Sequence, residues 1–284
     1  MISLNHIKIE LQHIKNRIKT QGILFYLKRQ VLKVKFKLEK RVVNKIRYKN
    51  EEIKIILEEK NGLVDLVIYS FGIFGKEFIE LIEKKLDKDK VFVDVGANIG
   101  QHSLILSRYC KKVISFEPLP ALYNQFKESV ELNGFQNIEI HNVGCSDVKE
   151  EKEITIDPIN AGGSTVLAHN NLLTNNKKET IKLDRLDDLI PNQQVDVIKI
   201  DVEGYEYFVL LGAEKIINTY KPTIFLEYSP DFYDKIDVKM SKKLYDLIKS
   251  YGYNIFAIQF NKNIFFFEDL PHTQIDLLLI HKDQ

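Results

Sequence analysis

The amino-acid sequence predicts an α/β fold in which a mostly parallel sheet carries helices on both faces. From residue 91 onward, short apolar runs typical of strands alternate with helix-like segments, which is the pattern of parallel strands joined by crossover helices. Several of the apolar runs end in a glycine or a carboxylate. In open α/β sheets, ligands bind beyond the carboxyl ends of the strands, so these residues are candidates for a site.

The first fifty residues differ in charge from the rest of the chain. They contain fourteen Lys and Arg but two acids, a net charge of +12, whereas the remaining chain is about −11. Apolar residues spaced by three and four from Ile7 to Ile18 predict an amphipathic helix, and we expect two such helices to meet near Gly22. The alternation over 31–38 also fits a strand. This segment fits an arm packed on its own domain, an oligomer contact, an anionic membrane surface or nucleic acid.

A hairpin and a helix are predicted between this segment and the main sheet. Asn61-Gly62 is a turn signal between two strand-like runs, 53–57 and 63–69. Apolar residues on one side of 76–86 predict a helix. The chain then enters the run 91–95, which is apolar except for Asp94, as expected of a buried parallel strand.

The remaining elements follow in alternation. We expect strands at 113–116, 138–143, 196–201 and 223–227, and helices at 101–110, 121–133, 205–213 and 239–251. Residues 149–185 interrupt this order with strand-like runs at 154–156 and 180–183 and a glycine-rich loop at 162–165. The tail predicts two or three closing strands.

The turn after residue 95 and the acid after the next strand indicate an adenosine-type ligand. Gly96 and Gly100 flank the turn, and Glu117 follows twenty-one residues after Gly96, where a carboxylate can bond both hydroxyls of a ribose. Asn98 stands where a dinucleotide site needs its middle glycine, which disfavours NAD. Asp94 suits an ammonium group. Together these features favour S-adenosylmethionine.

Four motifs in order resemble the FkbM family of methyltransferases. They are DVGANIG at 94–100, FEP at 116–118, IKIDVEG at 198–204 and KPTIFLE at 221–227. The resemblance covers about residues 60–260. It implies a Rossmann-like class I methyltransferase that uses S-adenosylmethionine, with a seven-stranded sheet whose last strand is antiparallel. We therefore expect a basic amphipathic extension at 1–60 and a catalytic domain at 61–284.

The resemblance also implies roles for residues at matching positions. Asp94, Gly96, Asn98, Gly100 and Ser103 would frame the methionine end of the cofactor, Glu117 would hold the ribose, Cys145, Ser146 and Asp147 would border the adenine, and Asp201 and Glu203 would be catalytic. Ser103 also fits a helix cap and Asp147 a simple turn residue.

The expected reaction is O-methylation of a hydroxyl on a sugar, a glycan, including a lipid-linked one, or a small molecule. Asp201 or Glu203 would remove the proton, with His102 and His169 as reserve bases. A Mg²⁺ ion on the two carboxylates is a second option, which we do not favour because no third ligand is evident. The alternatives are a nucleic-acid methyltransferase that uses the basic arm, or a non-catalytic module that binds S-adenosylmethionine.

Cysteine content and hydropathy bear on the compartment. Cys110 and Cys145 are too few for a disulfide framework. The sequence shows neither a signal-peptide pattern nor eighteen uninterrupted apolar residues. We expect a cytoplasmic protein with peripheral contact to an anionic membrane through residues 1–50.

Overall fold

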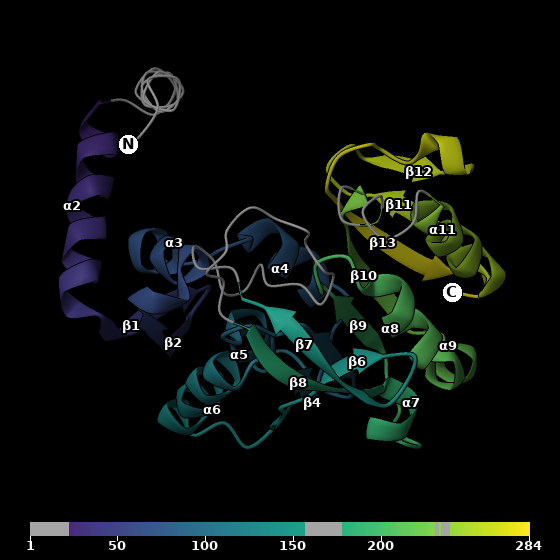
Figure 1. The fold of residues 1–284 in the computed structure, drawn as a ribbon, viewed down its shortest axis with the longest axis horizontal. Coiled ribbons are helices and arrows are strands. Elements are labelled where there is room, and N and C mark those ends of the chain that lie inside the picture. Colours follow the sequence, from purple (N-terminus) through teal and green to yellow (C-terminus); the bar gives the residue numbers. More distant parts are fainter. Residues whose placement is uncertain (1–22, 157–177, 231–232, 234–238) are drawn as a thin grey trace.

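The computed structural model describes residues 23–156, 178–230, 233 and 239–284. A central sheet of eight strands dominates the described chain (Figure 1). In spatial order its strands are β12 (Lys262–Ile264), β11 (Tyr253–Ala257), β13 (Ile275–His281), β10 (Thr223–Tyr228), β9 (Val197–Ile200), β3 (Val91–Val95), β4 (Lys112–Phe116) and β5 (Ile138–His141).

The direction of these strands confirms the predicted α/β class. The strands β10, β9, β3, β4 and β5 pair in parallel, and β13 pairs antiparallel with both β10 and β11. The last strand is therefore antiparallel, as expected. The expected number of seven strands was wrong, because β12 adds an eighth at the edge. It folds back on β11 through a turn in which Asn261 has a φ of 49°.

Helices cover both faces of the sheet. The described α-helices are α2 (Ile23–Glu39), α3 (Leu63–Phe71), α4 (Lys76–Glu83), α5 (Gln101–Leu106), α6 (Pro120–Asn133), α7 (Leu186–Leu189), α8 (Glu206–Gly212), α9 (Glu214–Tyr220) and α11 (Met240–Ser250). Helix α2 contacts α3 and lies away from the sheet (Figure 1). Successive side chains of β3 point to opposite faces of the sheet. Val93 packs with α8, α9 and α11, whereas Phe92 packs with α4, α5 and α6.

The N-terminal elements differ from the sequence-based prediction. Residues 31–38 belong to helix α2, so their interpretation as a strand was wrong; the helix expected before Gly22 lies outside the described residues. Strands β1 (Arg41–Tyr48) and β2 (Glu51–Glu58) form the hairpin here. The hairpin predicted across Asn61-Gly62 was wrong, because a short 3₁₀ turn (Glu59–Asn61) leads into helix α3 at residue 63. A short apolar run does not by itself distinguish a strand from a buried helix.

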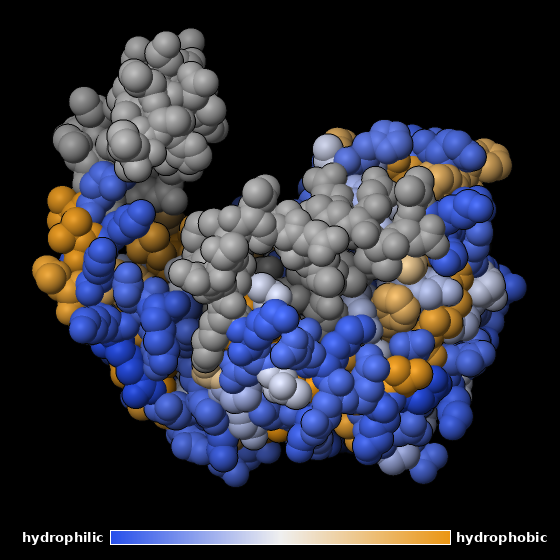
Figure 2. Space-filling view, in the orientation of Figure 1, coloured by the Kyte–Doolittle hydropathy of each residue, from blue (hydrophilic) through white to orange (hydrophobic). Residues whose placement is uncertain are grey.

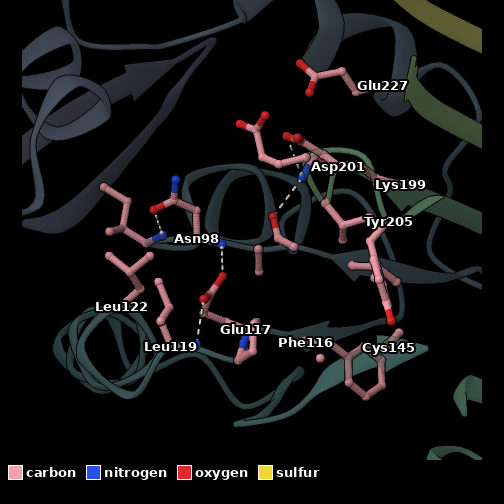
Figure 3. A pocket seen from close by; sticks show the side chains of 18 of the residues that line it. Asn98, Phe116, Glu117, Leu119, Leu122, Cys145, Lys199, Asp201, Tyr205 and Glu227 are labelled. Carbon is pink, nitrogen blue, oxygen red and sulfur yellow. Dashed lines mark hydrogen bonds and ion pairs between the residues drawn. The ribbon is translucent and has the colours of Figure 1, made fainter. Parts of the chain in front are cut away.

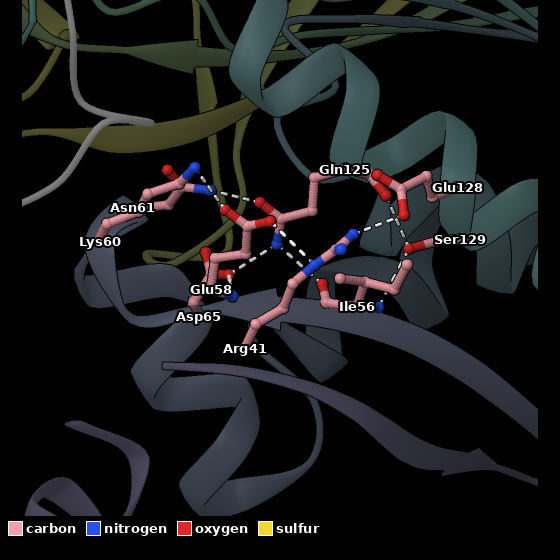
Figure 4. A network of polar contacts seen from close by, with 9 residues as sticks. All are labelled: Arg41, Ile56, Glu58, Lys60, Asn61, Asp65, Gln125, Glu128 and Ser129. Atoms are coloured by element: carbon pink, nitrogen blue, oxygen red, sulfur yellow. Dashed lines mark hydrogen bonds and ion pairs between the residues drawn. The ribbon is translucent and has the colours of Figure 1, made fainter. Parts of the chain in front are cut away.

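A buried polar network fastens these elements to α6 (Figure 4). The Asp65 carboxylate accepts hydrogen bonds from the Glu58 amide (2.6 Å) and the Gln125 side chain (2.7 Å). Gln125 also donates to the Ile56 carbonyl (2.8 Å), and the Ile56 amide donates to Ser129 (3.0 Å). These bonds join β2, α3 and α6, so α3 is fixed relative to a helix that packs on the main sheet.

A separate three-stranded sheet lies beside the main one. Its strands are β6 (Gly144–Ser146), β8 (Lys178–Arg185) and β7 (Glu150–Thr155), with β8 in the centre. The strand-like runs expected at 154–156 and 180–183 fall on or beside β7 and β8, whereas the loop expected at 162–165 lies outside the described residues. Over the described part of the chain, no helix has both the length and the apolar character needed to cross a bilayer.

Candidate active site

A cavity of about 520 Å³ opens at the carboxyl ends of β3, β4, β9 and β10 (Figure 3). This volume is in the range of small-molecule and cofactor sites. Asp201 and Glu227 lie toward one end of the cavity, and Leu119 and Leu122 toward the other. The cavity therefore lies where the order of strands in an open α/β sheet places a ligand.

Six of the eleven residues predicted for the site line the cavity. They are Gly96, Asn98, Glu117, Cys145, Asp201 and Glu203. Gly100 follows Asn98 and Ile99 in the same turn but does not line the cavity. It packs instead against the Phe126 ring of α6.

The two glycines of the turn after β3 are required by the fold. Gly96 has a φ of 79°, and a Cβ there would collide with the carbonyl oxygen of Asp201. Gly100 has a φ of 78°, and a Cβ there would collide with the ring of Phe126 on α6. The backbone after β3 therefore packs directly on the backbone after β9, which a side chain would prevent.

Asp94 lies beneath the turn and does not line the cavity. Its two oxygens accept hydrogen bonds from Ser103 Oγ (2.6 Å) and Lys199 Nζ (3.1 Å). Ser103, which also contacts Ser115, lies in the same buried layer. The ammonium group that faces Asp94 in this structure thus belongs to Lys199, a residue to which the sequence analysis gave no role.

Lys199 links Asp94 to the cavity. Its Nζ also donates to the Gly96 carbonyl (3.1 Å) and lies 3.4 Å from the Asp201 carboxylate. Burial lowers the pKa of this ammonium, but the charges of Asp94 and Asp201 outweigh that effect and raise the pKa above its ordinary value. Lys199 is therefore a fixed positive charge at the cavity wall.

Glu117 connects the turns that follow β3 and β4. One carboxylate oxygen accepts from the Asn98 amide and the other from the Leu119 amide, both at 2.9 Å. Burial raises the pKa of Glu117 to about 7, against the effect of these two amides. The carboxylate is held in one orientation at the cavity wall.

Of the three residues expected around an adenine, only one lines the cavity. Cys145 lines it, and burial raises the pKa of this thiol. Ser146 is fully buried in β6, where its hydroxyl lies 3.1 Å from Asp147 Oδ1. Asp147 also accepts a hydrogen bond from Arg185 through its carbonyl (2.8 Å). Neither Ser146 nor Asp147 lines the cavity.

Three carboxylates converge at the other end of the cavity. Oxygens of Asp201, Glu203 and Glu227 lie within 4.8 Å of one another. Burial, together with the charges of Asp201 and Glu203, raises the pKa of Glu227 to about 10, so this carboxyl holds a proton at neutral pH. Gln274 donates to one oxygen of Glu227 (2.7 Å). The set has the chemistry of a proton acceptor, and three carboxylates also suit a divalent cation.

Sequence reasoning missed Glu227 and Lys199 as site residues. Glu227 lies in the motif KPTIFLE. It could have been identified because it ends the predicted strand 223–227, which pairs with the strand that precedes Asp201. His102 lines the cavity, but burial lowers its pKa to about 4, so its imidazole is a weak base. His169 lies outside the described residues.

Elements before the glycine turn also form part of the cavity wall. Leu63 and Val64 of α3 and Phe74 line it. The Phe74 amide donates to the Gln101 side-chain oxygen of α5 (2.8 Å), and the Gln101 side-chain nitrogen donates to the Phe74 carbonyl (2.7 Å). The cavity wall therefore includes residues that precede the main sheet in the chain.

Comparison with known proteins places this geometry in a family. A chain named methyltransferase 1, from Beauveria bassiana, is 27% identical over 190 residues, which are 56% of this chain and 76% of that one. The hexuronic acid methyltransferase AglP of Haloferax volcanii is 30% identical over 147 residues, 51% of this chain and 58% of AglP. The crystal structure of methyltransferase FkbM from Methylobacillus flagellatus aligns with a TM-score of 0.44 and 13% identity, covering 89% of this chain and 58% of that one.

The region that contains the predicted motifs is the region that the family shares. The methyltransferase FkbM domain matches residues 94–255, which begin at Asp94 and include Glu117, Asp201 and Glu227. This span is more than half of the chain, and it confirms the resemblance found in the sequence. The chain belongs to the FkbM family of methyltransferases.

Proposed function

We propose that this methyltransferase transfers the methyl group of S-adenosylmethionine to a hydroxyl of a sugar, a glycan or a small molecule. The observation that carries the proposal is one cavity that contains the glycine turn, Glu117 and the carboxylates of Asp201 and Glu203. A family relative named for a hexuronic acid substrate supports a sugar as the acceptor.

The cavity fits this cofactor by the chemistry of its wall. Glu117 presents an oriented carboxylate, which suits a ribose diol, and Cys145 and Leu119 present buried apolar surface, which suits an adenine. We propose that Gly96 and Asn98 contact the methionine part, while Asp94, Gly100 and Ser103 fix the shape of the turn and Ser146 and Asp147 that of the adenine end. S-adenosylmethionine supplies an electrophilic methyl group on a sulfonium.

The residues of the chain then orient the acceptor and remove its proton. The carboxylate of Asp201 or Glu203 accepts the hydroxyl proton as the acceptor oxygen bonds to the methyl carbon, and the electron pair of the broken carbon–sulfur bond leaves with S-adenosylhomocysteine. Holding both reactants in one cavity supplies much of the rate enhancement. His102, with its lowered pKa, has no part in this proposal.

This proposal uses no divalent cation. Lys199 offsets one negative charge of the Asp94 and Asp201 pair, from 3.1 and 3.4 Å, and Glu227 is neutral because its pKa is raised to about 10. Glu227 nevertheless gives Asp201 and Glu203 the third carboxylate that a Mg²⁺ site would use. Activity that survives exhaustive treatment with EDTA is the expected result, and activity restored only by Mg²⁺ would contradict it.

The test of the function is product formation by the full chain. Purified protein is incubated with S-adenosylmethionine and a panel of neutral sugars, hexuronic acids and phenols, and S-adenosylhomocysteine and a mass gain of one methylene are followed together. We expect Asp201→Asn or Glu203→Gln to lower kcat by about 10²- to 10⁴-fold, as loss of a general base does. The exposed Glu268→Gln serves as the matched control.

Two results would overturn the proposal. Near-normal kcat in both carboxylate variants would show that neither Asp201 nor Glu203 is the base. Absence of S-adenosylhomocysteine binding in calorimetry would contradict the use of S-adenosylmethionine as the cofactor.

A further inference from the structure

Helix α2 exposes an apolar stripe that neither the sheet nor the cavity uses. Val31, Val34 and Leu38 are 66%, 60% and 78% exposed. Their spacings of three and four residues place them on one face of the helix. Figure 2 shows this apolar surface over α2, at the left of the view. We call these three residues the α2 stripe.

The opposite face of α2 is fastened to the protein. Phe36 is buried and stacks on the Tyr69 ring of α3 at 4.7 Å between centroids. The Tyr69 hydroxyl donates to Glu39 near the end of α2 (2.8 Å). Because Phe36 lies on the side of the helix opposite the α2 stripe and packs on α3, the α2 stripe remains exposed to solvent.

Lysines border the α2 stripe on both sides. With 3.6 residues per turn, Lys35 falls on one side of the stripe and Lys37 on the other, and both are exposed. They belong to the fifty-residue segment with a net charge of +12. An exposed apolar face flanked by basic residues is the arrangement of helices that lie in the interface of an anionic bilayer.

The positive charge of this segment favours one of two candidate partners for the α2 stripe, an anionic bilayer or a second copy of the chain. A second copy of the chain would bring another strongly basic segment against the first, at an electrostatic cost, whereas an anionic bilayer attracts it. We propose that α2 docks the protein on an anionic lipid bilayer, with the α2 stripe inserted at the headgroup boundary and Lys35 and Lys37 facing lipid phosphates.

The test is co-sedimentation of the full chain with vesicles. Wild-type protein should bind vesicles of phosphatidylcholine with about one third phosphatidylglycerol, and release them as salt is raised, because basic contacts to the surface are screened. The stripe variant Val31→Ser/Val34→Ser/Leu38→Ser should lower the partition coefficient at least tenfold. Since each basic residue contributes about fivefold, Lys35→Gln/Lys37→Gln should lower it by about 25-fold.

A matched control comes from the other end of the molecule. Phe265 and Phe266 are also exposed, at 67% and 68%, and they lie outside the basic first fifty residues. Phe265→Ser/Phe266→Ser should leave vesicle binding unchanged. Thermal unfolding by circular dichroism checks that all variants are folded.

Three results would overturn the proposal. They are wild-type protein that does not bind the anionic vesicles, a stripe variant that binds as well as wild type, and a wild-type dimer in sedimentation equilibrium that the stripe variant abolishes, which would assign the face to a second copy. The assay needs no turnover, so its failure is distinct from a failure of the proposed methyl transfer.

Discussion

Lys199 is the buried cation beneath the cavity. Its ammonium lies between Asp94 at 3.1 Å and Asp201 at 3.4 Å and offsets part of their charge. Among the described residues no ion pair reaches Glu227, the third carboxyl of the cluster, and Glu227 keeps its proton. The neutral Glu227 lies next to the charged Asp201, a difference that follows from their surroundings and not from their residue types.

This difference predicts that Glu227→Gln is mild. An amide and a protonated carboxyl are both neutral, so kcat at pH 7.5 should stay within about threefold of wild type, whereas Asp201→Asn removes a charge. Because the pKa of Glu227 is raised to about 10 when folded, wild-type stability falls as pH rises from about 4.5 to about 10.

Urea unfolding of both proteins at pH 6 and pH 9 checks this prediction. The Gln variant should lose less stability between the two pH values than wild type. An equal loss in both proteins, or a fall in kcat as large as that of Asp201→Asn, would contradict it.

The glycine turn gives a second prediction. Gly96→Ala adds a Cβ at a φ of 79° and against the Asp201 carbonyl, so we expect about 3 kcal/mol of destabilisation from backbone strain and overpacking together. Gly134→Ala is the matched control, because Gly134 has a φ of 66° with nothing within 4 Å of an added Cβ. It should cost only about 1 to 2 kcal/mol. Equal losses in urea unfolding would refute the role of the Asp201 contact.

At the residue scale, the sequence predicted the positions that depend on strand ends. Gly96, Glu117 and Asp201 meet because neighbouring parallel strands end at the same edge of the sheet. The place of Asp94 beneath the turn could not be predicted, because it depends on the Lys199 side chain reaching across from the adjacent strand β9. Sequence patterns record spacing along a strand, whereas this contact depends on the register between two strands.

The N-terminal elements show what periodicity leaves undecided. The run 63–69 is apolar with little alternation, and it forms helix α3 where a strand was predicted. The alternating run 31–38 forms a helix because Phe36 packs inward while alternate lysines remain in solvent. In both cases tertiary packing decided between patterns that the local sequence allowed.

The contact between α3 and α6 gives a prediction at the element scale. Asp65→Ala leaves the Glu58 amide and the Gln125 side chain without their buried acceptor, so we expect about 3 kcal/mol of destabilisation. Asp65→Asn keeps an acceptor oxygen and is the matched control. Burial raises the pKa of Asp65 to about 7, so the stability of wild type falls as pH rises from about 4 to about 7, and that of the Asn variant falls less.

Chemical unfolding at pH 5.5 and pH 8 measures this difference. At pH 8 the Asn variant should equal or exceed wild type. Ala and Asn variants of equal stability would contradict the assigned hydrogen bonds.

At the scale of the whole molecule, the parallel part of the sheet could be predicted from the sequence, whereas the edge strand β12 could not. The alternation of strands and helices specified the parallel part, but β12 has only three residues and pairs only with β11. Such a short edge strand forms because a turn returns the chain to β11, and three residues give little pattern from which to predict it.

The proposed cofactor should stabilise the whole fold. S-adenosylhomocysteine at about 100 times its Kd adds about 2.7 kcal/mol, which is roughly 5 °C or more in Tm for a chain of this size. Glu117→Ala should raise the Kd at least tenfold in calorimetry and reduce this shift, whereas the exposed Glu131→Ala on α6 should not. An unchanged Kd in the Glu117 variant would remove Glu117 from the ribose.

The wall formed by Leu63, Val64 and Phe74 lies outside the span that the family shares, which begins at residue 94. The cavity thus combines residues inside the family span with residues that come before it. The carboxylates of Glu117, Asp201, Glu203 and Glu227 all belong to the first group. We therefore expect a replacement of the segment before residue 75 to change which acceptor is methylated and to leave the residues of methyl transfer in place.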